Sequence, residues 1–267
     1  MKLRPVRTAK DIRLDDDDAR VRGRRLPSSG AIERATAKQV ARISELQRVL
    51  YADARHALLI VLQGRDASGK DGTIRKVFTA VNPQGCTVAS FGVPTPLEQR
   101  HDFLWRIHAQ IPPRGVIGIF NRSHYEDILV PRVHGQLDKQ ALEERYAHIN
   151  AFERLLASSG VTILKFMLHV SRDEQKRRLE ERLTDPSKNW KFRAGDLEDR
   201  ARWDDFDKAY RGILKNTSTR RAPWFLVPAD DKDVRDWLVA QAIADALERM
   251  DLSYPKADPS ITGLTVE

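Results

Sequence analysis

Short apolar runs alternate with amphipathic segments along the chain. Five runs without polar alternation are predicted to form buried strands, over residues 58–62, 86–91, 115–120, 161–168 and 224–227. Apolar residues at helical spacing predict helices over residues 32–53, 70–81, 97–110, 138–157, 172–183 and 231–250. Strands of this kind, each followed by a helix, are typical of a parallel sheet covered on both faces. The pattern therefore predicts a three-layer α/β fold with a five-stranded parallel sheet.

The length of the chain limits the number of domains. A chain of 267 residues is long enough for one α/β domain with a full core and too short for two large ones. We expect an N-terminal arm over residues 1–30, either flexible or lying over a neighbouring surface, and one domain over residues 31–267. The helix over residues 32–53 has one apolar face, which is expected to pack on the sheet or on another subunit.

Targeting signals are not apparent. The first thirty residues combine arginines with the acidic run Asp15–Asp18 and contain no apolar segment, unlike a secretory signal. No apolar run approaches the roughly 20 residues that span a bilayer. The single cysteine, Cys86, cannot form a disulfide within the chain. These features predict a reducing, cytoplasmic location and no membrane partner.

The charge balance favours an acidic partner. Lys and Arg total 46 against 38 Asp and Glu, a net charge of +8. Nucleic acid, an anionic membrane and a phosphorylated substrate would each fit this surplus. The basic residues are interspersed with acids, and neither an RNA-binding aromatic motif nor a zinc motif is present, so nucleic acid is not expected.

A glycine-framed loop directly follows the first predicted strand. Gly64 and Gly69 have the spacing of the G-x-x-x-x-G-K phosphate-binding loop, and Lys70 begins the next predicted helix. Backbone N–H groups of such a loop point at phosphate oxygens, and the lysine and the helix dipole add positive charge. The sequence therefore predicts a phosphate-binding loop made of Gly64, Arg65, Asp66, Ala67, Ser68, Gly69, Lys70, Asp71 and Gly72.

Two acids stand in or beside this loop. Asp71 replaces the Ser or Thr that usually follows the lysine, and Asp66 lies inside the loop. A carboxylate beside a phosphate chain is repelled unless Mg²⁺ bridges the two. For Asp71, a charge on the helix dipole is as good an explanation as a metal ligand. For Asp66 we favour the metal.

Polar residues also follow the third predicted strand, where ligands of open α/β sheets bind. Asn121 stands where a Walker-B aspartate commonly helps to hold Mg²⁺. Asp66 is therefore expected to carry the metal, with Glu126 or Asp127 as helpers, and Arg122 adds a guanidinium. His124 is either a general acid or base, or a residue that orients its neighbours.

A second charged region resembles a lid, around residues 176–215. Arg178 and Arg182 are four residues apart on one predicted helix face, so both could reach one anionic chain. A polar segment with Pro186 and Trp190 follows and leads into another predicted helix. A lid would exclude water during phosphoryl transfer. The alternative is a solvated helical hairpin whose arginines pair with nearby acids.

Taken together, several segments resemble the polyphosphate kinase 2 family, in the branch that accepts both AMP and ADP. The resemblance extends from about residue 54 to 227 and is carried by residues 64–72, 121–127, 131–133, 174–182, 185–192 and 199–203. It implies a P-loop, nucleotide-kinase-like fold with a helical lid. It also implies phosphoryl transfer from inorganic polyphosphate to AMP and ADP, with Mg²⁺ or in its place Mn²⁺, in a dimer or tetramer.

The resemblance also implies roles for individual residues. Asp66 would serve the metal and the acceptor phosphate, with Glu126 and Asp127 as further metal ligands. Lys70, Arg122, Arg178 and Arg182 would act on the reacting phosphates, and Glu126 would place the AMP phosphate. The nucleotide and phosphate site would include the loop residues together with Asn121, Arg132 and Lys188. Arg65 and Ser68 depart from the common family pattern, and Arg65 would add a charge beside the loop.

An ATP-dependent nucleoside monophosphate kinase of the adenylate or thymidylate kinase type is the alternative enzyme, because it uses the same loop and fold. A non-catalytic P-loop binding protein is an alternative of another class. The choice of phosphoryl donor separates these hypotheses.

Overall fold

The computed structural model describes residues 1–21, 26–261 and 264–266, and its centre is a parallel sheet. The strands in these residues are β1 (Ala57–Gln63), β2 (Cys86–Ser90), β3 (Ile117–Asn121), β4 (Val161–His169) and β5 (Trp224–Pro228). Their order is β2-β3-β1-β4-β5, and every neighbouring pair is parallel. The predicted five-stranded parallel sheet and three-layer α/β fold are confirmed.

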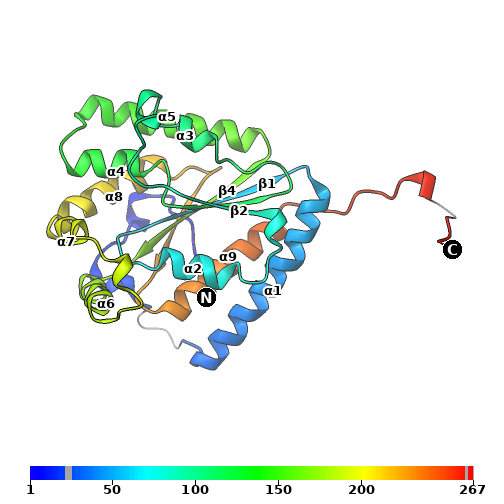
Figure 1. Cartoon of the computed structure of the whole chain (residues 1–267), viewed down its shortest axis with the longest axis horizontal. Coiled ribbons are helices and arrows are strands. Elements are labelled where there is room, and N and C mark those ends of the chain that lie inside the picture. The colour runs from blue at the N-terminus through cyan, green and yellow to red at the C-terminus, as the bar shows by residue number, and fades with distance from the viewer. Residues whose placement is uncertain (22–25, 262–263, 267) are drawn as a thin grey trace.

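Helices cover both faces of the sheet (Figure 1). One face is covered by α1 (Ser29–Asp53), α2 (Lys70–Val77) and α9 (Lys232–Glu248). The other is covered by α3 (Trp105–His108), α4 (Glu126–Val133), α5 (Lys139–Ser158) and α8 (Trp203–Thr217). The helices α6 (Arg172–Thr184) and α7 (Gly195–Ala201) lie together at one end. The apolar face of α1 therefore packs within the chain, against α9 and the sheet.

The central strand β1 shows how the sequence creates two cores. Side chains alternate along a strand, so Leu59 and Val61 join the core under α4, α5 and α8, whereas Leu58 and Ile60 join the core under α1 and α9. All seven residues of β1 are buried. Burial on both faces explains why the sequence shows a continuous apolar run here.

The segment between β2 and β3 differs from the prediction. The helix expected over residues 97–110 is wrong, since only a 3₁₀ turn over Glu98–Arg100 and the short α3 form there. Thr95 and Glu98 cap the first turn, and the Asp102 carboxylate accepts from the Leu104 amide. Such local side-chain bonds compete with a continuous helix. In addition, α2 ends at Val77 rather than at residue 81, and α4 was not expected from the sequence.

The region predicted as a lid divides into two parts. The helix α8 buries a full apolar face against α4 and α5, including Phe206, Tyr210 and Ile213, so it belongs to the core. The residues that project are the end of α6, a 3₁₀ turn over Asn189–Lys191 and α7. The projecting segment is therefore shorter than the predicted lid, and its mobility stays a prediction.

The N-terminal segment, predicted to be a flexible arm, lies against the domain over residues 1–21. Val6 and Leu14 are buried, and the Val6 amide donates to the Trp224 carbonyl at 2.8 Å. Asp16 accepts from the backbone N–H of Arg172 at the start of α6, and Arg20 pairs with Asp230 at 2.6 Å. Residues 1–21 therefore form an arm that lies over the surface of the domain. Residues 22–25 of the predicted arm lie outside the described residues.

No helix within the described residues is both long and apolar enough to cross a bilayer.

The packing of the N-terminal segment can be tested by Leu14→Ala. Because Leu14 is only 3 % exposed, we expect the free energy of unfolding to fall by about 2–4 kcal/mol, measured by urea denaturation. Leu264→Ala is the matched control, since Leu264 is 72 % exposed and should change stability little. Equal stability of the two variants would contradict the packing of this segment.

Candidate phosphate-binding and active site

The phosphate loop leaves the end of β1 at the centre of the sheet. Sheet order places β1 between β3 and β4, and Leu62 pairs with Asn121 at the end of β3. Gly69 has φ of +104°, and a Cβ there would collide with the Arg235 guanidinium. A Cβ on Gly64 would lie 2.6 Å from the Leu168 carbonyl. Only glycine fits either position, which explains the spacing seen in the sequence.

Side chains behind the loop bind its carbonyl groups. Arg178 Nη1 donates to the carbonyls of Ala67 and Ser68, at 2.9 and 3.2 Å. Its Nη2 donates to the carbonyls of Ala229 and Asp230, and its Nε to Glu174. The expectation that Arg178 shares a phosphate-facing surface with Arg182 is wrong, because protein acceptors occupy its buried guanidinium. Arg178 instead fixes the shape of the loop.

Two further residues support the loop and were not found from the sequence. The Gln175 amide donates to the Asp66 carbonyl at 3.1 Å, and Arg235 Nη1 lies 3.5 Å from the Ser68 carbonyl. Gln175 lies one turn before Arg178 on α6. This helical spacing is the signal in the sequence that could have indicated Gln175. Arg235 is in α9, far from the motif in sequence, and carried no such signal.

Lys70 lies at the start of α2 and is 8 % exposed. Its ammonium donates to the carbonyls of Gly64 at 2.8 Å and Arg65 at 3.2 Å. Burial lowers the pKa of Lys70 to about 8, and the nearby Arg122 adds to this effect, while Asp66 and Glu126 oppose it. The amine is therefore positioned over the loop with a charge that titrates near neutral pH.

Arg122 lies between two carboxylates. Its Nη2 is 2.5 Å from Asp66 and its Nη1 is 3.9 Å from Glu126. Burial alone would raise the pKa of Asp66, but Lys70, Arg122 and Arg182 outweigh it and lower that pKa. The same burial raises the pKa of Glu126, which Arg122 and Lys70 offset only in part. The structure thus brings together Asp66, Lys70, Arg122 and Glu126, and their roles in binding and catalysis stay predictions.

Asp71 and Asn121 form a second pair at the open side of the loop. The Asn121 amide donates to Asp71 at 2.7 Å, and Lys191 of the projecting segment lies 3.9 Å from the same carboxylate. Asp71 is in the first turn of α2, where its charge is favoured by the helix dipole. Asp71 thus carries a charge at the start of α2 and connects that helix to β3 and to the projecting segment.

The described residues contain no group of three or more His, Cys, Asp or Glu that could hold a metal ion alone. A site with one or two carboxylates suits an ion that takes its other ligands from phosphate and water. Asp66 meets that requirement, because its lowered pKa keeps it ionised. Glu126 is the other carboxylate next to Arg122, and its side chain is 13 % exposed. These residues fit a divalent ion bound together with phosphate.

Four predicted site residues face other partners. Asp127 pairs with Arg106 at 3.0 Å, which directs its carboxylate to the segment after β2. Arg65 stacks on Trp203 at 3.7 Å and binds Asp207 at 2.8 Å, so its charge faces α8 rather than a phosphate. Arg132 donates to the Tyr146 hydroxyl, and Lys188 pairs with Glu181 and Asp185. These four side chains therefore do not join the cluster at the phosphate loop.

Arg182 is the arginine of α6 that contacts the projecting segment. It lies 3.2 Å from Asp196 of α7 and is one of the charges that lower the pKa of Asp66. Its guanidinium also donates to the Lys191 carbonyl at 3.2 Å. Arg182 therefore connects the projecting segment to the acid of the loop.

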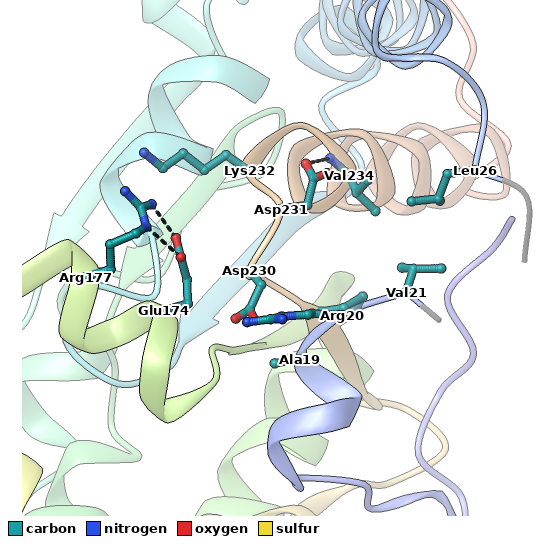
Figure 2. Close-up of a pocket in the computed structure, with 11 residues that line it drawn as sticks. Ala19, Arg20, Val21, Leu26, Glu174, Arg177, Asp230, Asp231, Lys232 and Val234 are labelled. Carbon is teal, nitrogen blue, oxygen red and sulfur yellow. Dashed lines mark hydrogen bonds and ion pairs between the residues drawn. The ribbon is translucent and has the colours of Figure 1, made fainter. Parts of the chain in front are cut away.

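A cavity of about 560 Å³ lies beside α6 and the start of α9, and Figure 2 shows its lining. Arg177 and Arg20 line it, but each pairs with an acid, Glu174 and Asp230 respectively. Arg178 is not part of the lining, but it donates to the carbonyl of Asp230, which is. Both arginines of the lining are thus paired with acids, and Lys232 adds a third cation to the lining.

Comparison with known proteins adds to this geometry. The model of the polyphosphate kinase 2 family matches residues 27–255. The chain belongs to the polyphosphate kinase 2 family. It is 51% identical over 226 residues to an AMP/ADP-polyphosphate phosphotransferase of Meiothermus ruber, covering 85% of each chain. It is 46% identical over 234 residues to an ADP-polyphosphate phosphotransferase of Rhodopseudomonas palustris, covering 83% of this chain and 81% of the relative.

A solved structure agrees with this family membership. A polyphosphate kinase 2 from Arthrobacter aurescens TC1 superimposes with a TM-score of 0.85 at 41% identity, covering 96% of this chain and 95% of that one. The relatives of this polyphosphate kinase 2 member are named as phosphotransferases, so the protein is an enzyme of that class.

The charge of Lys70 can be tested by phosphate binding as a function of pH. Lys70 is charged below its pKa of about 8 and neutral above it. Between pH 7 and pH 9.5, we therefore expect the Kd of the wild-type protein for inorganic triphosphate to rise about tenfold more than the Kd of Lys70→Arg, whose side chain stays charged. Titration calorimetry measures both. Since the probe's own titration is common to the two proteins, parallel curves would show that Lys70 does not bind the anion.

Proposed function

We propose that this protein transfers a phosphoryl group from inorganic polyphosphate to AMP and ADP, forming ADP and ATP. The observation that carries this proposal is the match to the polyphosphate kinase 2 family together with 51% identity to an AMP/ADP-polyphosphate phosphotransferase. The cluster of Lys70, Asp66, Arg122 and Glu126 at the phosphate loop supports it.

The arrangement suggests how the two substrates are divided. Polyphosphate lies on the backbone N–H groups of the loop, with Lys70 and Arg182 as counter-charges. Arg122 binds the acceptor phosphate and brings its oxygen in line with the terminal phosphorus of the donor. The oxygen–phosphorus bond forms while the bond to the remaining polyphosphate breaks, and the shortened chain leaves. Charge spread over the transferring group is met by fixed cations, so the protein contributes mainly position and electrostatics.

A divalent ion, Mg²⁺ or Mn²⁺, completes the proposed site. When bound, it neutralises the phosphate charge that the acids would otherwise repel. Asp66 would hold it, with Glu126 as a second ligand. Asp127 is the weaker candidate because Arg106 engages its carboxylate. Burial raises the pKa of Glu126, and a bound cation would favour its ionised form.

An ATP-dependent nucleoside monophosphate kinase is not favoured. The relatives reported above are named for polyphosphate as a substrate, and the relative from Meiothermus ruber is named for both AMP and ADP. We further propose that the protein works in the cytoplasm as a dimer or tetramer.

The donor assay tests this function. The protein is mixed with ADP, Mg²⁺ and long-chain polyphosphate, and ATP is measured by luminescence. A second mixture contains AMP and ATP without polyphosphate. We expect ATP in the first mixture and little ADP in the second. Asp66→Asn keeps the shape of the side chain but removes its charge, so it should lower the rate at least ~10²-fold. Product only in the second mixture would establish the ATP-dependent alternative.

Acceptor choice gives a sharper prediction. An acid at position 126 can hold a metal between itself and the AMP phosphate, whereas a neutral amide is a poorer ligand for a hard cation. Glu126→Asn should therefore lower AMP phosphorylation relative to ADP phosphorylation by about tenfold, or about 1.4 kcal/mol of differential transition-state binding. Initial rates at saturating polyphosphate measure the ratio. An unchanged ratio would remove Glu126 from acceptor selection.

A further inference from the structure

A charged pair lies buried beneath the segment that carries Arg122 and Glu126. Lys165 is in the middle of β4 and Glu153 is on α5, and both are at most 1 % exposed. Lys165 Nζ lies 2.7 Å from Glu153 Oε2. It also donates to the Tyr125 hydroxyl and the Thr217 carbonyl, each at 2.8 Å. All three ammonium protons therefore have acceptors.

The other oxygen of Glu153 binds the motif after β3. Tyr125 donates its hydroxyl proton to Glu153 Oε1 at 2.7 Å, and His124 Nε2 lies 3.3 Å from the same oxygen. The Tyr125 ring is fully buried and packs edge-on against Trp224, with centroids 4.8 Å apart. Tyr125 is thus held at its hydroxyl by both charges of the pair and at its ring by β5.

Tyr125 connects this pair to the proposed acceptor site. It is the N-cap of α4, and Glu126 is the first residue of that helix. Arg122, three residues earlier, has φ of +64°, a left-handed conformation that costs energy in a residue with a side chain. Such conformations persist where surrounding contacts over-determine them. The contacts of Tyr125 and His124 fix the chain between Arg122 and Glu126.

Packing alone does not explain why Lys165 and Glu153, rather than two apolar residues, occupy this part of the core. Removing two charges from water is costly, and apolar residues of similar volume often replace a buried ion pair without loss of stability. Lys165 and Glu153 lie among aromatic and aliphatic residues of the core under α4, α5 and α8. Their polar contacts are directed to the motif and to the end of α8, which points to a requirement for geometry at the motif.

We infer that the buried Lys165–Glu153 pair positions Arg122 and Glu126 for the acceptor phosphate, acting through the Tyr125 hydroxyl. Lys165, Glu153 and Tyr125 are positioning residues, because all three are buried in the core beneath the motif. The inference rests on the proposed function for its kinetic readout. His124 contributes as an orienting residue bonded to Glu153, rather than as a general acid or base.

The direct test is Tyr125→Phe, which removes one oxygen and keeps the ring. We expect kcat/KM for AMP and for ADP to fall about tenfold, while the KM for polyphosphate changes less than about twofold. Amide hydrogen exchange should accelerate over residues 122–128 and stay unchanged in the phosphate loop. Ile43→Val is the matched control, because Ile43 is fully buried in the core on the other face of the sheet. It should weaken the fold without the kinetic split.

A second variant decides the matter if Tyr125→Phe does not fold. Glu153→Gln combined with Lys165→Met removes both charges at nearly constant volume and should give a folded protein with the same loss for acceptors. Wild-type kinetics and exchange in either folded variant would overturn the inference, as would an equal loss for acceptors and polyphosphate. If the wild-type protein makes no ATP from polyphosphate, the proposed function fails. In that case the exchange over residues 122–128 still tests the positioning.

Discussion

The active-site geometry depends on one constraint, which is that the carbonyl groups of the phosphate loop must be satisfied from behind. A peptide group that turns its N–H toward a phosphate turns its carbonyl away, and a buried carbonyl without a donor is costly. Arg178 and Gln175 of α6 supply donors to Ala67, Ser68 and Asp66. Lys70 supplies one to Gly64. The binding surface therefore exists only while α6 is correctly placed.

The placement of α6 draws on distant parts of the chain. Ser171 caps the helix and binds Asp230, while Asp16 accepts from the Arg172 amide. Arg178 also reaches the Ala229 carbonyl after β5. The N-terminal segment, the loop after β5 and the phosphate loop thus meet on one helix. Arg65 adds a connection to α8 through Trp203, so α8 also constrains the loop.

Much of the fold and half of the site could be read from local sequence. Buried strands give continuous apolar runs, and two glycines with no room for a Cβ identify the loop at Gly64 and Gly69. Side-chain direction could not be read. The acids at 126 and 127 are adjacent, yet one faces Arg122 and the other Arg106, because successive helical residues point about 100° apart. The direction of the Arg178 side chain is likewise set by the Ser68 carbonyl, which lies 110 residues away in the sequence.

The N-terminal segment also changes the surface that the sheet presents to other molecules. Pro5 forms an antiparallel bridge with Phe225, and Val6 donates to the Trp224 carbonyl, so this segment lies along the outer side of β5. Exposed strand edges are templates for pairing with other chains, and proline cannot extend the ladder because it has no N–H. Pro5 therefore terminates the sheet on this side and protects the folded protein against edge-to-edge aggregation.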